Sequence, residues 1–314
     1  MNKHVVGIAA MILLSAPAAY SAEPGTQTQK QPGPSSTVDT TAIEKAIGKG
    51  GELKDNVYKI SLPRTDLSVT VKGVKVKPGL ALGSWVAFTE AGGQAVIDGD
   101  LVLTEDEVAP VFQKLRKEGI EVTALHNHLI GESPRVMFLH IAGKGEATQL
   151  AAQIKNALSL TKTPLGEPPA RTGESAGKIA SENAAFNAER IQDTLGHKGQ
   201  VKGGVLSISV PRPEHITMKG TTLPPSMGMA TALNFQSAGQ GTVAATGDFV
   251  LTHDEVNSVT KALAENGIEV TALHNHLVQG SPDLYFMHFW ANDSADKVAK
   301  GLKAGLDAMK KSKN

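Results

Sequence analysis

The sequence predicts an α+β protein built from two tandem repeats of one domain, and two observations predict it. The segment from Gly99 to His140 aligns without a gap on the segment from Gly247 to His288, an offset of 148 residues. Within each copy, strand-like stretches with period-two alternation are interleaved with amphipathic stretches at helical spacing. A repeat period of this length indicates tandem domains, because solenoid units run about 20 to 50 residues.

The two copies share specific motifs as well as their spacing. GDLVLTEDEV recurs as GDFVLTHDEV, GIEVTALHNHL recurs unchanged, and in both copies a Ser-Pro step is followed by Phe-x-His. Upstream, Pro63-Arg64 aligns on Pro211-Arg212. Pro, Gly, Ser, Thr and Ala are frequent between the copies, which is typical of a linker. We therefore expect a first repeat domain at 40–160, a linker at 161–181 and a second repeat domain at 182–314.

Each repeat is expected to open with a short helix and an antiparallel meander. In the first copy, Thr41 and Glu44 have the spacing of a capping box, and Gly48 is a helix stop, which predicts a helix over Thr41–Ile47. Alternating stretches separated by Pro and Gly predict the strands of the meander, at 57–62, 67–71 and 85–88.

A β-α-β-β-α order follows the meander and resembles a ferredoxin-like unit. It comprises a strand at 96–103, a helix ending at Gly119, strands at 120–129 and 136–141, and a helix at 146–160. The first helix is expected to begin with a capping box of Thr104 and Glu107 and to bury Val108, Val111, Phe112 and Leu115. The acidic residues of this motif, Asp106 and Glu107, are interpreted as capping and first-turn charges and not as catalytic groups.

Composition and missing motifs exclude several classes of function. Lys+Arg and Asp+Glu both number 31, so no net field favours nucleic acid, and no nucleic-acid partner is expected. The chain has no cysteine, which excludes disulfides, thiolate metal sites and cysteine nucleophiles. There is no G-x-S-x-G, H-E-x-x-H or phosphate-binding glycine loop, so serine hydrolysis, zincin chemistry and phosphoryl transfer have no support.

The N-terminus has the three parts of a secretory signal. Met1 to His4 precedes an apolar run from Val5 to Leu14, and small residues follow as far as Ala22. The apolar run is shorter than the roughly 20 residues that a spanning helix needs, so no stable membrane insertion is expected. We predict a signal peptide at 1–21, with cleavage after Ala18 as the alternative, and a disordered leader at 22–39. The mature product would be periplasmic or secreted.

Three histidines in each repeat are the candidate metal ligands. Period two puts His126 and His128 on one face of their strand, and His140 lies on the strand that follows. The equivalent residues of the second repeat are His274, His276 and His288. Three neutral imidazoles can hold a divalent metal and leave one position open for water or substrate. Zinc is the first expectation, with copper, iron or manganese as alternatives, and a hydrolase or lyase that uses metal-activated water is one reading.

The register of the histidine strands is open at the level of sequence. A hairpin centred on Glu132 places His126 opposite Phe138, with His140 diagonal to it, whereas one centred on Ser133 places His126 opposite His140. The structural alternative is that the imidazoles are hydrogen-bonded groups at the edge of the core and that Asn127 braces the loop.

An Arg with a carboxylate two residues later also recurs in both copies. Arg64 and Asp66 align on Arg212 and Glu214. These residues are candidates for binding an anionic small-molecule or envelope ligand, or for supporting the histidines from outside. A salt bridge is the competing interpretation. The alternative function is therefore a non-catalytic periplasmic or envelope binding protein for an anionic ligand.

Taken together, the repeated GD-x-VLT, ALHNHL and Phe-x-His motifs resemble the LppY/LpqO family of exported bacterial proteins. The resemblance covers nearly all of both repeats. It implies a bacterial, exported domain of unknown function that often occurs in two copies, and it implies no particular activity. The lipoprotein members carry an anchoring Cys that this chain lacks, so the resemblance favours a periplasmic or secreted product over an anchored one.

Overall fold

A computed structural model describes residues 38–166 and 186–311, which lie within one compact unit, Ser36–Asn314. The predicted signal peptide at 1–21, residues 22–37 of the leader predicted at 22–39, and residues 167–181 of the predicted linker lie outside the described residues. No helix in the described ranges is long and apolar enough to cross a membrane.

The first repeat forms a six-stranded antiparallel sheet in the order β1-β2-β5-β6-β9-β7. Its strands are β1 (Glu52–Lys54), β2 (Val57–Pro63), β5 (Gly83–Ala91), β6 (Gln94–Thr104), β7 (Glu121–His126) and β9 (Val136–Gly145). Its helices are α1 (Thr40–Ile47), α2 (Pro78–Ala81), α3 (Glu105–Glu118) and α4 (Ala147–Leu158). A small second sheet has the order β4-β3-β8, with β3 at Thr70–Val71, β4 at Val74–Lys75 and β8 at Glu132–Ser133.

The second repeat has the same architecture, in the order β10-β11-β14-β15-β18-β16. Its strands are β10 (Gly199–Lys202), β11 (Val205–Pro211), β14 (Ala230–Gly239), β15 (Thr242–Thr252), β16 (Glu269–His274) and β18 (Leu284–Ser294). Its helices are α5 (Ala188–Leu195), η1 (Pro225–Met227), α6 (His253–Glu265) and α7 (Ala295–Lys311). The small sheet is β13-β12-β17, with β12 at Thr217–Met218, β13 at Thr221–Thr222 and β17 at Gly280–Ser281.

The topology confirms the predicted fold class. Strands β1, β2, β5 and β6 form the meander. Strand β9 lies between β6 and β7 and is antiparallel to both, so the unit β6-α3-β7 is split by β9 as in ferredoxin-like domains. The stretch predicted as a strand at 67–71 contributes only β3, which belongs to the small sheet.

Local details of the helices differ from the prediction in two places. Helix α1 is capped by Asp39, whose carboxylate accepts from the Ala42 amide at 3.0 Å, so the capping box predicted at Thr41 is wrong. The capping box of α3, at Thr104 and Glu107, is confirmed. Phe112 was predicted to be buried but is 39% exposed, because one residue rotates it about 100° away from its buried neighbour Val111.

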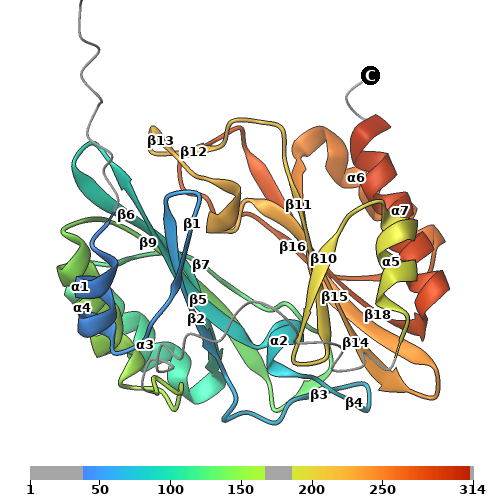
Figure 1. The fold of residues 1–314 in the computed structure, drawn as a ribbon, viewed down its shortest axis with the longest axis horizontal. Helices are drawn as coiled ribbons and strands as arrows, with labels where there is room; N and C mark the ends of the chain where they lie inside the picture. The colour runs from blue at the N-terminus through green and yellow to red at the C-terminus, as the bar shows by residue number, and fades with distance from the viewer. Residues whose placement is uncertain (1–37, 167–185, 312–314) are drawn as a thin grey trace, which may run out of the picture. The chain divides into compact units, whose positions relative to one another are not determined.

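Each sheet has one face against its long helices; the opposite face, named here the helix-free face because the long helices do not cover it, contacts the short α2 or η1. Figure 1 shows α1, α3 and α4 along one face of the first sheet, and α5, α6 and α7 along one face of the second. Alternation decides which side chains lie on which face. In β6, Ile97, Leu101 and Leu103 belong to the core beneath the helices, so Asp98 and Asp100 lie on the helix-free face.

The helix-free faces of the two repeats share two further hydrophobic cores. One core contains Val57 and Ala142 of the first repeat together with Met218 and Phe286 of the second. The other combines residues of both repeats in the same way, among them Val102, Phe138, Ala244 and Trp290. Reciprocal ion pairs, Lys72 with Glu269 and Lys219 with Glu121, also connect the repeats. Side chains on these faces therefore meet side chains of the other repeat.

Candidate metal centre

A β-bulge turns the first histidine toward the other repeat. Strand β7 shifts register against β9 between Val122 and Ala124. Val122 packs against the core beneath the helices, but Ala124 lies opposite His140, whose side chain is on the helix-free face. Strict period-two alternation would put Val122 and His126 on the same face, but the bulge inserts one residue between them and places them on opposite faces. Strand β16 has the same irregularity between Val270 and Ala272.

The register of the histidine hairpin is the one centred on Glu132. His126 lies opposite Phe138, and His140 is diagonal to it. The diagonal position does not separate the imidazoles, because the ring centroids of His126 and His140 are 4.9 Å apart. The rings of His126 and His128 are 5.0 Å apart.

The six candidate histidines form one group that includes both repeats, named here the histidine cluster: His126, His128, His140, His274, His276 and His288. Three short ring contacts cross from one repeat to the other. The centroids are 3.5 Å apart for His126 and His274, 3.6 Å for His128 and His288, and 3.8 Å for His140 and His276. The sequence predicts a separate trio in each copy and contains no sign that the trios meet.

Two trios of the cluster have the spacing of metal ligands. His126, His128 and His140 each offer a ring nitrogen within 4.8 Å of the others. The second trio, His126, His274 and His288, mixes the repeats. Within the described residues, the trio predicted for the second repeat alone does not reach this spacing.

Most of the ring nitrogens in the cluster have no hydrogen-bond partner. Each of the six imidazoles has at least one buried nitrogen without a partner among the described residues, and His140 and His274 have two. Buried polar atoms are rarely left unpaired, since each costs about 1–3 kcal/mol. A metal ion would satisfy several of these nitrogens at once. The structural alternative requires hydrogen bonds to the imidazoles, and these ring nitrogens have none among the described residues.

Burial favours the neutral form of five of the imidazoles. It lowers the pKa of His126 to about 4 and that of His274 to about 3, and charge repulsion from neighbouring imidazoles adds to the effect. The pKa values of His128, His140 and His276 are also held well below the usual value, first by burial and then by the other histidines. Neutral imidazole is the form that ligates a metal.

Two aspartates that the sequence analysis missed lie against the cluster. Asp100 is opposite His140 in the β6–β9 ladder, and Asp248 is opposite His288 in the β15–β18 ladder. The carboxylate of Asp100 is 3.7 Å from His140 Nε2 and 3.9 Å from His128 Nε2, and Asp248 Oδ1 is 3.0 Å from His288 Nδ1. Both belong to the repeated GD motif, and their alternation with buried apolar residues was a signal that could have identified them.

The two aspartates are not electrostatically equivalent. Burial raises the pKa of Asp100 well above its usual value, and repulsion from Asp248 adds to it. Burial also acts to raise the pKa of Asp248, but the charge interaction and contact with His288 more than offset it, so the net pKa is lowered. The surroundings therefore favour the protonated form of Asp100 and the ionised form of Asp248.

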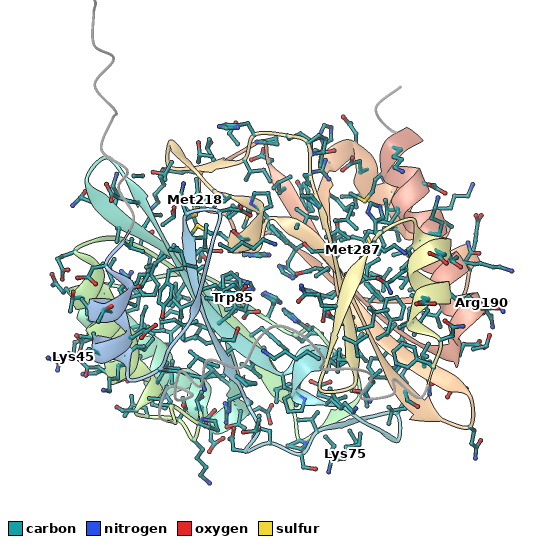
Figure 2. The ribbon with its side chains drawn as sticks, in the orientation of Figure 1. Lys45, Lys75, Trp85, Arg190, Met218 and Met287 are labelled. Carbon is teal, nitrogen blue, oxygen red and sulfur yellow. The ribbon has the colours of Figure 1, made fainter. Side chains whose placement is uncertain are left out.

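The first repeat adds three polar or aromatic residues that the second lacks. The ammonium of Lys59 lies 3.8 Å above the ring of Trp85, and burial lowers the pKa of Lys59 to about 8. Burial raises the pKa of Asp98, also to about 8. Figure 2 shows Trp85 on the side of the first sheet away from α1 and α4. At the equivalent positions of the sheet the second repeat has Ser207, Ala232 and Thr246.

A cavity of about 200 Å³ lies beside the histidine cluster. His128, His288, Asp100, Asp248 and Trp85 are among the residues that line it, so both repeats contribute to its wall. A small molecule in this space would meet imidazole, carboxyl and indole groups.

Asn127 braces the cluster and links the repeats. Its side-chain amide donates to the Leu129 carbonyl at 3.0 Å and to the Thr271 carbonyl at 3.4 Å. In return, the Thr271 hydroxyl donates to the His128 carbonyl at 2.6 Å. The predicted bracing role of Asn127 matches these contacts, which also fix the backbone around His128 relative to the second repeat.

The predicted ligand-binding pairs lie in buried ion-pair networks. Arg64 is fully buried and donates to Asp66 at 2.8 Å, to Glu107 at 2.7 Å and to the Val102 carbonyl at 2.6 Å. Contacts of the same kind join Arg212 to Glu214, Glu255 and the Val250 carbonyl. The salt-bridge interpretation describes these contacts, and a ligand-binding role for Arg64, Asp66, Arg212 and Glu214 stays a prediction.

Comparison with known families finds one match that covers most of the chain. A family model described as Domain of Unknown Function (DUF1259) matches residues 41–160 and again residues 189–308. The match supports two copies of a domain of unknown function, and the finer LppY/LpqO resemblance stays a prediction. A search of curated proteins finds no significant match.

Solved structures give only weak likenesses. A trimeric bacterial microcompartment shell protein, PduB, is 11% identical over 85% of this chain and 92% of its own, with a TM-score of 0.22. EtuB from Clostridium kluyveri is 9% identical over 83% and 91%, with a TM-score of 0.19. The structure of crystal form I of TP0453 is 12% identical over 86% and 98%, with a TM-score of 0.18. Scores this low support no inference about function.

Proposed function

The chain belongs to the DUF1259 family, and we propose that its two copies together bind a divalent transition metal at the histidine cluster. One observation carries the proposal: buried imidazole nitrogens without hydrogen-bond partners converge at ligand spacing. Imidazole ligands suit zinc first, with copper, iron or manganese as alternatives. We take the mixed trio, His126, His274 and His288, as the ligand set, so the proposed centre is shared between the repeats.

The residues around the cluster are suited to metal-assisted hydrolysis or elimination. Three imidazoles leave a coordination position open, and a metal there would lower the pKa of its bound water to about 7. Asp100 and Asp248 line the adjoining cavity with opposite protonation tendencies, so one can donate a proton and the other accept one. A metal-dependent hydrolase or lyase is therefore the activity we propose.

The alternative is a non-catalytic periplasmic or envelope binding protein for an anionic small molecule. It is favoured by a lysine-lined cavity close to the cluster, described in the next subsection. Export, to the periplasm or out of the cell, also stays a proposal. It rests on the signal-like residues 1–22, and mass spectrometry of the N-terminus of the mature protein tests it.

Elemental analysis tests the metal proposal. The mature protein, purified without a histidine tag, is compared with His126→Ala, which removes the residue common to both ligand trios. The matched control is His253→Ala, which removes an exposed imidazole at the start of α6. We expect near-stoichiometric metal in the native protein and in the control, and its loss in His126→Ala.

Metal-free native protein that also takes up no added zinc, copper, iron or manganese would contradict the proposal. Equal metal content in all three proteins would place the ion outside the cluster. If the metal is present, hydrolysis of ester, amide and phosphoester test substrates by the loaded protein and by the EDTA-treated protein then separates an enzyme from a binding protein.

A further inference from the structure

A second cavity adjoins the cavity beside the histidine cluster. It has a volume of about 500 Å³ and is named here the lysine cavity, after Lys59, Lys77 and Lys202 in its lining. Gly79, Gly83 and Trp85 line both cavities, so the two spaces share a wall. A molecule in the lysine cavity would thus lie next to the space that reaches His128 and His288.

The lysine cavity concentrates positive charge. Its three charged side chains are all lysines, and no carboxylate is among its lining residues, although the chain as a whole has a net charge of zero. The ammonium groups of Lys59 and Lys77 donate to backbone carbonyls, of Ser226 at 3.3 Å and of Gly203 at 3.1 Å. Carbonyl oxygens satisfy hydrogen bonds but do not neutralise the charge. The carboxylates that interact with Lys59, Asp98 and Asp100, lie outside this lining.

The two cavities have opposite electrostatic character. The lysine cavity also contains the hydroxyls of Ser61 and Ser207, which suit oxygen acceptors. The cavity beside the cluster is lined by Asp248, whose carboxylate disfavours an anionic group there. The indole of Trp85 lines both cavities and offers an apolar surface to each. A molecule that occupied both cavities would therefore place its anionic end in the lysine cavity and its uncharged end beside the cluster.

We propose that the lysine cavity binds the carboxylate or phosphate end of a small organic molecule whose uncharged end lies beside the histidine cluster. The position of the uncharged end, beside the histidine cluster, rests on the proposed function. The position of the anionic end rests on the lysine cavity alone. The inference names the substrate class: small organic anions with an apolar or neutral portion that can lie along Trp85. The anion is held by lysines contributed by both repeats, and not by the buried Arg64 and Arg212.

Calorimetry with phenyl phosphate at low ionic strength tests the inference, with phenol as the uncharged comparison. Lys77 and Lys202 are exposed, so their joint replacement by Met should leave the fold intact. We expect the native protein to bind phenyl phosphate more tightly than phenol. We also expect the Lys77→Met/Lys202→Met variant to lose about tenfold or more in affinity, on the order of 1.4 kcal/mol.

Two further variants control for charge in general. Lys77→Arg/Lys202→Arg keeps the charges and should restore most of the affinity. Lys144→Met removes an exposed lysine of β9 that does not line either cavity, and it should bind as the native protein does. Equal affinity of the native and the double Met proteins, or no binding of phenyl phosphate by any of them, would overturn the inference.

Measuring metal content in the same samples separates this inference from the proposed function. Lysine-dependent binding by both the EDTA-treated and the metal-loaded protein supports the inference, whether or not a metal is native. Binding that requires metal and ignores the lysine substitutions would place the anion on the metal itself and overturn the inference while leaving the metal centre standing.

Discussion

The buried arginine networks and the histidine cluster are both polar, both repeated and both enclosed, yet their hydrogen bonding differs. Around Arg64, the guanidinium donates to two carboxylates and a carbonyl. Around His126, ring nitrogens of all six histidines are left without hydrogen-bond partners among the described residues. The comparison teaches that recurrence and burial do not identify a binding site, whereas the balance of donors and acceptors does.

The largest effect we expect is on stability, at the arginine network. Arg64→Ala leaves the buried carboxylate of Glu107 without the guanidinium that balances its charge, which should lower the free energy of unfolding by about 3–5 kcal/mol. Urea unfolding measures this change. Metal uptake by the folded variant should be unaffected, because none of the hydrogen-bond partners of Arg64 is a histidine of the cluster.

Arg190→Ala is the matched control, since Arg190 pairs with Asp296 at the surface. A variant at Arg64 that is as stable as the control, or that loses metal while remaining folded, would remove the distinction between the two regions.

The next effect is the pH dependence of the metal-free protein. The folded pKa values of His126 and His274, about 4 and about 3, lie below the unfolded value of about 6.5, so the unfolded state binds more protons in that window. Stability should therefore be highest above about pH 6.5 and fall as the pH drops toward 4. The raised pKa values of Asp98 and Asp100 act in the opposite direction, but two carboxyls oppose five histidines with lowered pKa.

Urea titrations at pH 7, 5.5 and 4.5 measure this slope. His126→Ala/His274→Ala removes two of the titrating groups and should flatten it. A stability that is constant, or that rises, between pH 6.5 and pH 4.5 would mean that the imidazoles are not held neutral by the fold.

A smaller effect is expected at the aspartates beside the cluster. Asp100→Asn keeps the size of the side chain and removes its ability to carry charge near His128 and His140, which should weaken metal binding about tenfold. Asp98→Thr introduces the residue type that the second repeat has at this position and should change metal affinity little. Competition titrations with a chromophoric chelator compare the two, and an equal loss in both variants would assign the effect to general electrostatics.

The sequence predicted the fold because its signals are local. Thr104 and Glu107 begin α3 as expected, and the β-α-β-β-α order follows from hydrophobic periodicity and from glycines at the helix ends. These features depend on residues close together in the chain. The same locality explains the error at Thr41, where the neighbouring Asp39 is the better N-cap.

The sequence identified only part of the candidate site. The six histidines could be selected because they recur, but their union in one cluster depends on helix-free faces that pack across the repeats. The bulge at Val122–Ala124 decides on which face His126 lies, but it does not change the alternation of residue types in the sequence. Asp100 and Asp248 were not selected, because a single strand does not show which of its side chains lie opposite the histidines of a neighbouring strand.

The measurement that tests the shared centre most directly is zinc titration of three variants: His126→Ala, His274→Ala and the double variant. If one centre is built from both repeats, each single substitution should weaken binding by on the order of 100-fold, and the double substitution should add little. If each single variant instead keeps half of the bound zinc at native affinity and the double variant loses all of it, the repeats hold independent sites and the account of a shared centre is wrong.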